Sequence, residues 1–154
     1  MARRVNEMRD PLWTIEDRLP TPAEHRRLAE AVGWRDAFDW DSLPRSLAGS
    51  TFGVVAVVDA EAVGMARVVG DGVKYFAVQD VAVHPHYQGE GIGRDLVQRA
   101  LDRIAVLAPS PAFVSLFSTR EGADLYESLG FTRGDMTGMF QIVEPAGPGR
   151  EGTP

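Results

Sequence analysis

Three alternating glycines, at positions 89, 91 and 93, constrain this chain more than any other feature of its sequence. They follow a buried apolar run that ends at Pro85, and they precede a segment with the pattern of one helical face. The first N–H groups of a helix have no intrahelical acceptor and carry partial positive charge. Glycines in the turn before such a helix let a phosphate approach those N–H groups. The stretch therefore predicts an anion-binding site.

Two known phosphate-binding motifs do not fit this stretch. The dinucleotide fingerprint needs a third glycine where Arg94 stands, and the P-loop needs a closing Gly-Lys-Ser/Thr that is absent. The pattern that fits is Gln/Arg-x-x-Gly-x-Gly, which here runs from Gln88 to Gly93.

Size and composition limit the function classes. A length of 154 residues predicts one domain, here residues 1–144 followed by a disordered Pro/Gly-rich tail over 145–154. A net charge of −6 argues against nucleic acid as a partner. The chain has no cysteine, no apolar run of membrane-spanning length and no signal-peptide pattern within Met1–Asp10, so we expect a cytoplasmic protein that does not bind a membrane. Three histidines far apart give a metal site little support, and we expect no metal.

Local patterns predict the order of the elements. Thr21-Pro22-Ala23-Glu24 is a capping box that starts a helix, and Gly33 is expected to end that helix. Strands are predicted over residues 12–19, 52–58, 63–69, 75–83 and 112–117, and further helices near 41–47, over 92–107 and over 121–129. A last hairpin is expected over 131–143. The strand over 112–117 follows a strand and a helix, so it should lie parallel to the strand over 75–83.

A second motif lies late in the chain, where Ala123 is followed by Leu125-Tyr126-Glu127-Ser128-Leu129-Gly130-Phe131. Together with the glycine stretch, it resembles the GNAT superfamily of acetyl-CoA-dependent N-acetyltransferases. The resemblance implies an α/β (α+β) three-layer fold. Its central sheet is mixed and mostly antiparallel, with helices on both faces. It also implies a V-shaped splay between two parallel central strands, with acetyl-CoA in the gap.

The resemblance assigns the acetyl-CoA site residue by residue. The pantetheine arm is expected on the backbone of the Val81–Val83 strand and the pyrophosphate on the glycine loop. Ser118 stands with Thr119 where the family often has an asparagine. The assigned set is Val81, Ala82, Val83, Gln88, Gly89, Glu90, Gly91, Ile92, Gly93, Arg94, Ser118 and Tyr126.

The implied reaction is direct attack of a neutral amine on the thioester of acetyl-CoA. Tyr126 matches the family's general acid for the leaving thiolate, because a phenol can donate a proton to a thiolate. Asp80 and His84 are the candidate bases. Burial in an apolar strand should raise the pKa of Asp80, although the carboxylate could equally anchor a loop or a substrate ammonium group. Proton loss through ordered water is also open. His25 and His86 are interpreted as surface residues.

The acceptor is not specified by the sequence. Trp34, Trp40 and Asp80 are candidate substrate-binding residues, although packing in the core is the favoured interpretation of the two tryptophans. The leading hypothesis is acetylation of a primary amine on a small molecule. The alternatives are acetylation of a protein N-terminus or lysine, and a non-catalytic acyl-CoA-binding module. The resemblance also implies a possible homodimer.

Overall fold

The computed structural model describes residues 11–148. The chain falls into two compact units that divide between Leu116 and Phe117. The predictions for residues 1–10 and for most of the tail, 149–154, lie outside the described residues, and the single domain over 1–144 stays a prediction. Along the chain the elements are β1 (Thr14–Glu16), α1 (Pro22–Ala31), η1 (Arg35–Ala37), α2 (Leu43–Ala48), β2 (Phe52–Val58), β3 (Glu61–Gly70), β4 (Tyr75–Val83), η2 (Pro85–Tyr87), α3 (Ile92–Leu107), β5 (Phe113–Ser115) and α4 (Ala123–Ser128).

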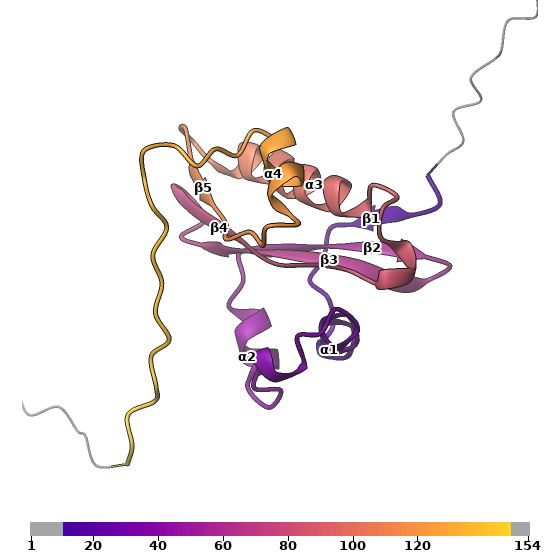
Figure 1. The fold of residues 1–154 in the computed structure, drawn as a ribbon, viewed down its shortest axis with the longest axis horizontal. Coiled ribbons are helices and arrows are strands. Elements are labelled where there is room, and N and C mark those ends of the chain that lie inside the picture. Colours follow the sequence, from indigo (N-terminus) through magenta and orange to yellow (C-terminus); the bar gives the residue numbers. More distant parts are fainter. Residues whose placement is uncertain (1–10, 149–154) are drawn as a thin grey trace, which may run out of the picture. The chain divides into compact units, whose positions relative to one another are not determined.

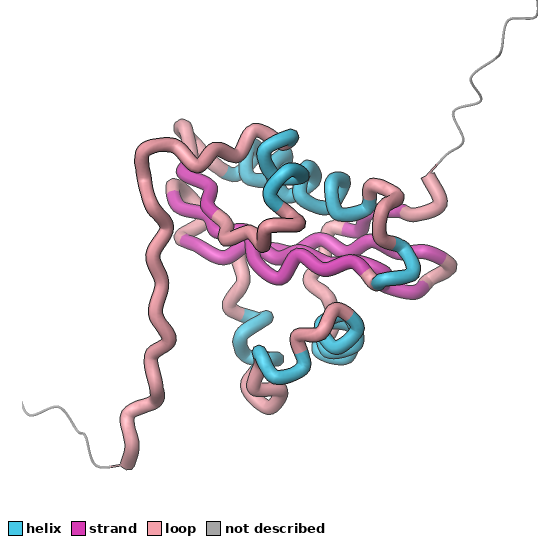
Figure 2. Tube along the Cα trace, viewed as in Figure 1, coloured by secondary structure: helices cyan, strands magenta, loops and turns pink. Residues whose placement is uncertain are grey.

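The first unit is built on a five-stranded sheet in the order β1-β2-β3-β4-β5 (Figures 1 and 2). The pairs from β1 to β4 are antiparallel, whereas β5 pairs parallel to β4. The βαβ connection through α3 therefore gives the predicted parallel pair. The mixed, mostly antiparallel sheet is confirmed.

Helices cover both faces of this sheet (Figure 1). On one face α1 buries Leu28 and Ala29 against β2 and β3. On the other face α3 buries Ile92 and Leu96 against the same two strands. Strand β2 is buried at every position because alternate side chains enter the two layers of core. Burial on both faces explains why its sequence reads as an unbroken apolar run.

Strand β4 contains a β-bulge next to Asp80. Met65 of β3 pairs with Ala82, but Arg67 pairs with Gln79, so β4 carries one more residue than β3 across this interval. Asp80 lies at the bulge and has a left-handed backbone conformation, with a φ of +53°. The bulge changes the alternation of β4. Phe76 and Val78 pack on the α3 side before it, and Val81 and Val83 do so after it, as the core clusters show.

The second unit corrects one prediction. Residues 131–143 form no hairpin, because the described residues beyond Phe131 contain no strand and no backbone–backbone hydrogen bond. Their apolar side chains are 70–87% exposed: Met136, Met139, Phe140, Ile142 and Val143. A hairpin needs a further strand or a helix against its apolar face, and none covers this segment. Strand β5 is an edge strand of the described sheet, not the central strand that was expected.

Within residues 11–148, the longest helix is α3, and no helix there is both long and apolar enough to cross a membrane.

Candidate active site

The glycine loop joins the end of β4 to the start of α3. Gly89 has a φ of +80° and Gly91, the N-cap of α3, has a φ of +104°. Both values lie in the left-handed region that favours glycine. A Cβ atom at either position would meet no heavy atom within 4 Å, so backbone conformation and not crowding requires glycine here. The loop is therefore open around the first-turn N–H groups of α3, as an anion site requires.

Gln88, at the start of this loop, is hydrogen-bonded back to β4. Its Nε2 donates a hydrogen bond of 2.9 Å to the carbonyl oxygen of Val83, the last residue of β4. Trp13 secures the other side of the helix start, because its Nε1 donates to Asp95 Oδ2 at 2.9 Å. The first contact ties the loop to the end of β4, and the second ties the first turn of α3 to the segment before β1.

Beyond its first residues, β4 has one free edge. It pairs with β5 only from Tyr75 to Ala77, whereas the rest of the strand up to Val83 has a described neighbour only on the β3 side. The pairing thus ends part-way along β4, on the side where the resemblance implied a gap. Unpaired N–H and C=O groups on such an edge can accept an extended ligand as an added strand. The edge runs directly toward the glycine loop.

Asp80 is the centre of a polar network on the α1 face of the sheet. Its Oδ2 atom accepts hydrogen bonds from His25 Nε2 at 2.9 Å and from Arg67 Nε at 2.8 Å. The guanidinium of Arg67 also donates to Ser46 and Ser50, which ties the network to the segment that includes α2. Side-chain exposure is 13% for Asp80 and 0% for His25. Helix α1 and strands β3 and β4 thus meet at one carboxylate.

The electrostatics of Asp80 differ from the prediction. Burial does act to raise the pKa of this carboxyl, but the hydrogen bond from His25 and the charge of Arg67 outweigh it, so the pKa is lowered. The expectation of a raised pKa is therefore wrong, because the sequence did not reveal the two partners. A carboxylate with a lowered pKa is a poor proton acceptor and a good anchor.

This pairing makes stability depend on pH. A lowered folded-state pKa means that Asp80 stabilises the fold above its unfolded-state value near 3.9 and loses that contribution as pH falls through the folded-state value. We expect Asp80→Asn to lower the free energy of unfolding by about 1–3 kcal/mol at pH 7. The difference from wild type should shrink below about pH 4. Urea unfolding at both pH values measures it.

Asp36→Asn is the matched control for this prediction, because Asp36 is exposed in η1. It should leave the free energy of unfolding nearly unchanged at pH 7. A loss for Asp80→Asn that stayed constant down to pH 2 would show that the carboxylate charge is not what stabilises the fold.

His25 was predicted to lie on the surface, and that prediction is wrong. Its ring is fully buried and makes an edge-on contact with Phe38 at 4.8 Å between ring centroids. A usable signal was present, since His25 precedes Leu28 and Ala29 by three and four residues and so shares their apolar helical face. His86, by contrast, is exposed as expected.

His84 stays close to the glycine loop. It is half-buried, and its Nδ1 accepts a hydrogen bond of 3.2 Å from the backbone N–H of His86. That bond favours the neutral tautomer with hydrogen on Nε2, and the lone pair that a base needs is then already engaged on Nδ1. The geometry therefore gives no support to His84 as the base.

Trp34 and Trp40 are half-buried and pack against the core beneath α1. Trp40 also lies under the guanidinium of Arg26, at 5.0 Å from its ring centroid. Packing accounts for both side chains. Their role in binding a substrate stays a prediction.

The second unit holds Tyr126 on α4. The side chain is half-buried, burial raises its pKa above the ordinary value of 10, and its ring makes an edge-on contact with Phe131 at 6.0 Å. The phenol therefore stays protonated at neutral pH, as a proton donor requires. Ser118 is exposed, and its hydroxyl donates to the carbonyl oxygen of Thr119 at 2.6 Å.

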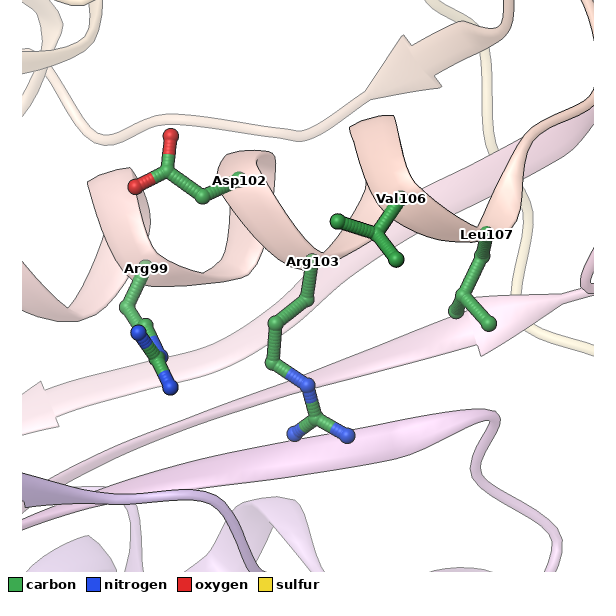
Figure 3. Close-up of a pocket in the computed structure, with 5 residues that line it drawn as sticks. All are labelled: Arg99, Asp102, Arg103, Val106 and Leu107. Atoms are coloured by element: carbon green, nitrogen blue, oxygen red, sulfur yellow. The ribbon is translucent and has the colours of Figure 1, made fainter.

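A hollow of about 310 Å³ lies on the C-terminal half of α3, and Figure 3 shows the side chains that line it. They are Arg99, Asp102, Arg103, Val106 and Leu107. Arg99 is paired with Asp17, and Arg103 donates to the carbonyl oxygen of Gly53 at 2.9 Å. Arg99, the lining residue nearest to the loop in sequence, lies eight residues from Gly91, or about 12 Å along the helix. The hollow is therefore separate from the glycine loop.

The described residues contain no group of three His, Asp or Glu side chains placed to hold a metal ion.

Comparison with known proteins agrees with this architecture. Residues 49–133, more than half of the chain, match the family described as acetyltransferase (GNAT) domain. The acetyltransferase SP0256 of Streptococcus pneumoniae, a GNAT-family protein, is 32% identical over 86% of this chain and 99% of its own, with a TM-score of 0.72. Protein SA2161 of methicillin-resistant Staphylococcus aureus is 26% identical over 85% of this chain and 99% of its own, with a TM-score of 0.76.

The mixed sheet, the glycine loop and these matches define an acyltransferase fold. The chain belongs to the GNAT family of acetyltransferases. Among curated proteins, GCN5-related N-acetyltransferase 2 of Arabidopsis thaliana, described as chloroplastic, is 38% identical over 69 residues. That match covers 45% of this chain and only 26% of the plant protein. An acetyltransferase of Brucella melitensis, 22% identical with a TM-score of 0.60, has the same fold and was solved in complex with acetyl-CoA; the match covers 78% of this chain and 82% of that one.

Proposed function

We propose that this protein transfers the acetyl group of acetyl-CoA to a primary amine of a small molecule. The observation that carries the proposal is the continuous path formed by the free edge of β4 and the glycine loop. Gly89 and Gly91 adopt positive φ values at the start of the 16-residue helix α3. This arrangement suits an extended arm that ends in a pyrophosphate. The acetyl-CoA bound by the Brucella relative supports the same donor.

In the proposed reaction, the nitrogen lone pair of the amine attacks the thioester carbonyl carbon and the C–S bond then breaks. Tyr126 gives its phenolic proton to the leaving thiolate. The raised pKa of Tyr126 keeps the phenol protonated until that step. The developing oxyanion needs a donor, and backbone N–H groups of the Val81–Val83 strand are the candidates. The chain has no cysteine, so the acetyl group does not pass through a thiol of the protein.

The amine must also lose a proton, and we propose that ordered water removes it. Asp80 is a weak base because its pKa is lowered, and the Nδ1 lone pair of His84 is engaged. We assign Asp80 instead to binding the acceptor, since a carboxylate can accept hydrogen bonds from an amino group.

The deciding experiment measures release of free CoA from acetyl-CoA across a panel of primary amines. Turnover with one amine, with acetylated product found by mass spectrometry, would support the small-molecule proposal. Binding of acetyl-CoA with turnover only on peptides would favour a protein acceptor. Binding without any turnover would favour a non-catalytic acyl-CoA-binding module, and failure to bind acetyl-CoA would overturn the proposal. A homodimer stays a prediction that the sedimentation coefficient would test.

A further inference from the structure

One oxygen of Asp80 is held by the protein and the other is not. His25 Nε2 and Arg67 Nε both reach Oδ2, at 2.9 and 2.8 Å, whereas no described residue donates a hydrogen bond to Oδ1. The side chain keeps 13% exposure, so it is not sealed in the core. A carboxylate oxygen in such a position can accept one more hydrogen bond from a ligand. Asp80 also directly precedes the Val81–Val83 strand, which the proposed reaction uses.

Stabilising the fold does not by itself account for this arrangement of Asp80 and His25. Asp80 adopts a φ of +53°, a left-handed conformation that is uncommon for non-glycine residues, although aspartate adopts it more readily than most. His25 is fully buried, yet its Nδ1 has no hydrogen-bond partner within the described structure. Buried polar atoms are rarely left without partners, and strained residues that persist tend to mark functional sites.

The surroundings of His25 fix the direction of its ring. Phe38 contacts it edge-on at 4.8 Å and Trp40 lies at 6.3 Å, both between ring centroids. Nε2 is the atom that reaches Asp80, so the tautomer with hydrogen on Nε2 donates to Oδ2. This tautomer leaves only a lone pair, and no hydrogen, unsatisfied at Nδ1. The groups facing the carboxylate are the imidazole of His25 from α1 and the guanidinium of Arg67 from β3.

We propose that His25 is a positioning residue for the acetyl acceptor: it holds Oδ2 of Asp80, together with Arg67, so that Oδ1 accepts a hydrogen bond from the acceptor's amino group. This inference rests on the proposed function. It makes α1 part of the acceptor site, although α1 lies outside the region matched by the family. The inference also accounts for the bulge in β4, because the bulge turns the side chain of Asp80 toward α1.

The test uses two variants of His25 in the full chain, measured at saturating acetyl-CoA with the amine that turns over best. His25→Leu removes the donor, and His25→Gln keeps an amide N–H near the position of Nε2. Loss of a hydrogen bond to a charged group corresponds to about a 10- to 100-fold effect. We therefore expect His25→Leu to lower kcat/KM for the amine by that factor. The KM for acetyl-CoA, measured separately with the acetyl-CoA concentration varied, should be unchanged. His25→Gln should recover most of the loss.

Two controls separate positioning from packing. Leu28→Val alters a fully buried neighbour one turn along α1 and should lower stability without changing kcat/KM for the amine. In an Asp80→Asn background, His25→Leu should cause little further loss, because His25 acts through Asp80. Equal losses for the Leu and Gln variants, or additive losses with Asp80→Asn, would overturn the proposal.

A measurement without turnover keeps this inference distinct from the proposed function. The titration of the Asp80 carboxyl carbon can be followed by NMR. Its pKa should rise in His25→Leu, since the hydrogen bond that helps to lower it is gone. An unchanged pKa would show that His25 does not hold Asp80. If the pKa of Asp80 rises as expected in His25→Leu but the wild-type protein acetylates no amine, His25 does hold Asp80. The proposed function would then be overturned, and with it the role of Asp80 in binding the acceptor.

Discussion

Gly91→Ala should weaken acetyl-CoA binding at least tenfold. Gly91 has a φ of +104° at the N-cap of α3, and an alanine there costs about 1–2 kcal/mol or forces the loop into another conformation. Relaxation of the loop would turn the N–H groups of the first helical turn away from the pyrophosphate. Each hydrogen bond to a charged group contributes about 1.5–3 kcal/mol, so loss of one is enough for a tenfold effect. Calorimetric titration with acetyl-CoA measures it.

Gly33 offers a closely matched control. It has a φ of +86° after the end of α1, and a Cβ there would also meet no heavy atom within 4 Å. Gly33→Ala should therefore lower stability about as much as Gly91→Ala but leave the affinity for acetyl-CoA unchanged. Equal affinities for wild type and Gly91→Ala would show that the glycine loop does not bind the donor.

Tyr126→Phe should lower kcat by about 100-fold or more, because general acid catalysis contributes about 10²–10⁴ to a rate. The substitution removes only the hydroxyl, so the KM for acetyl-CoA should change little. Burial raises the pKa of Tyr126 above 10, so the wild-type enzyme should show no fall in kcat below pH 9 that is due to this group. Steady-state kinetics from pH 6 to pH 9 measure both effects.

Tyr75→Phe makes the same chemical change at an exposed tyrosine on β4 and should leave kcat unchanged. If Tyr126→Phe kept the wild-type kcat while the transferase reaction proceeded, the leaving thiolate would take its proton from another source, and Tyr126 would have no part in the chemistry.

Local sequence signals were enough for most of the first unit. The capping box at Thr21 is formed as predicted, with Thr21 Oγ1 accepting from the N–H of Glu24 and the Glu24 side chain accepting from the N–H of Thr21. Strands β2 and β4 and helix α3 have the predicted bounds. Each of these depends on residues within a few positions of one another. Hydrophobic period, capping chemistry and glycine conformation can all be read at that range.

The Asp80 network could not be read in this way. Its members lie on α1, β3 and β4, and His25 is 55 residues from Asp80 in sequence. Only the packing of α1 on the sheet brings the imidazole to the carboxylate, and only the bulge turns the carboxylate toward it. The direction of the pKa shift followed from these partners, so a prediction from burial alone had the wrong sign.

The segment 131–143 also shows that a local sequence pattern does not specify contacts with distant segments. Its apolar residues suit a hairpin locally, but a hairpin is stable only against further structure that the sequence pattern cannot specify. The sequence by itself determined the family, the order of strands and helices as far as α4, and the glycine loop, because those depend on near neighbours in the chain. The tertiary structure decided the charge state of Asp80, the burial of His25 and the edge position of β5, because those depend on which distant segments pack together.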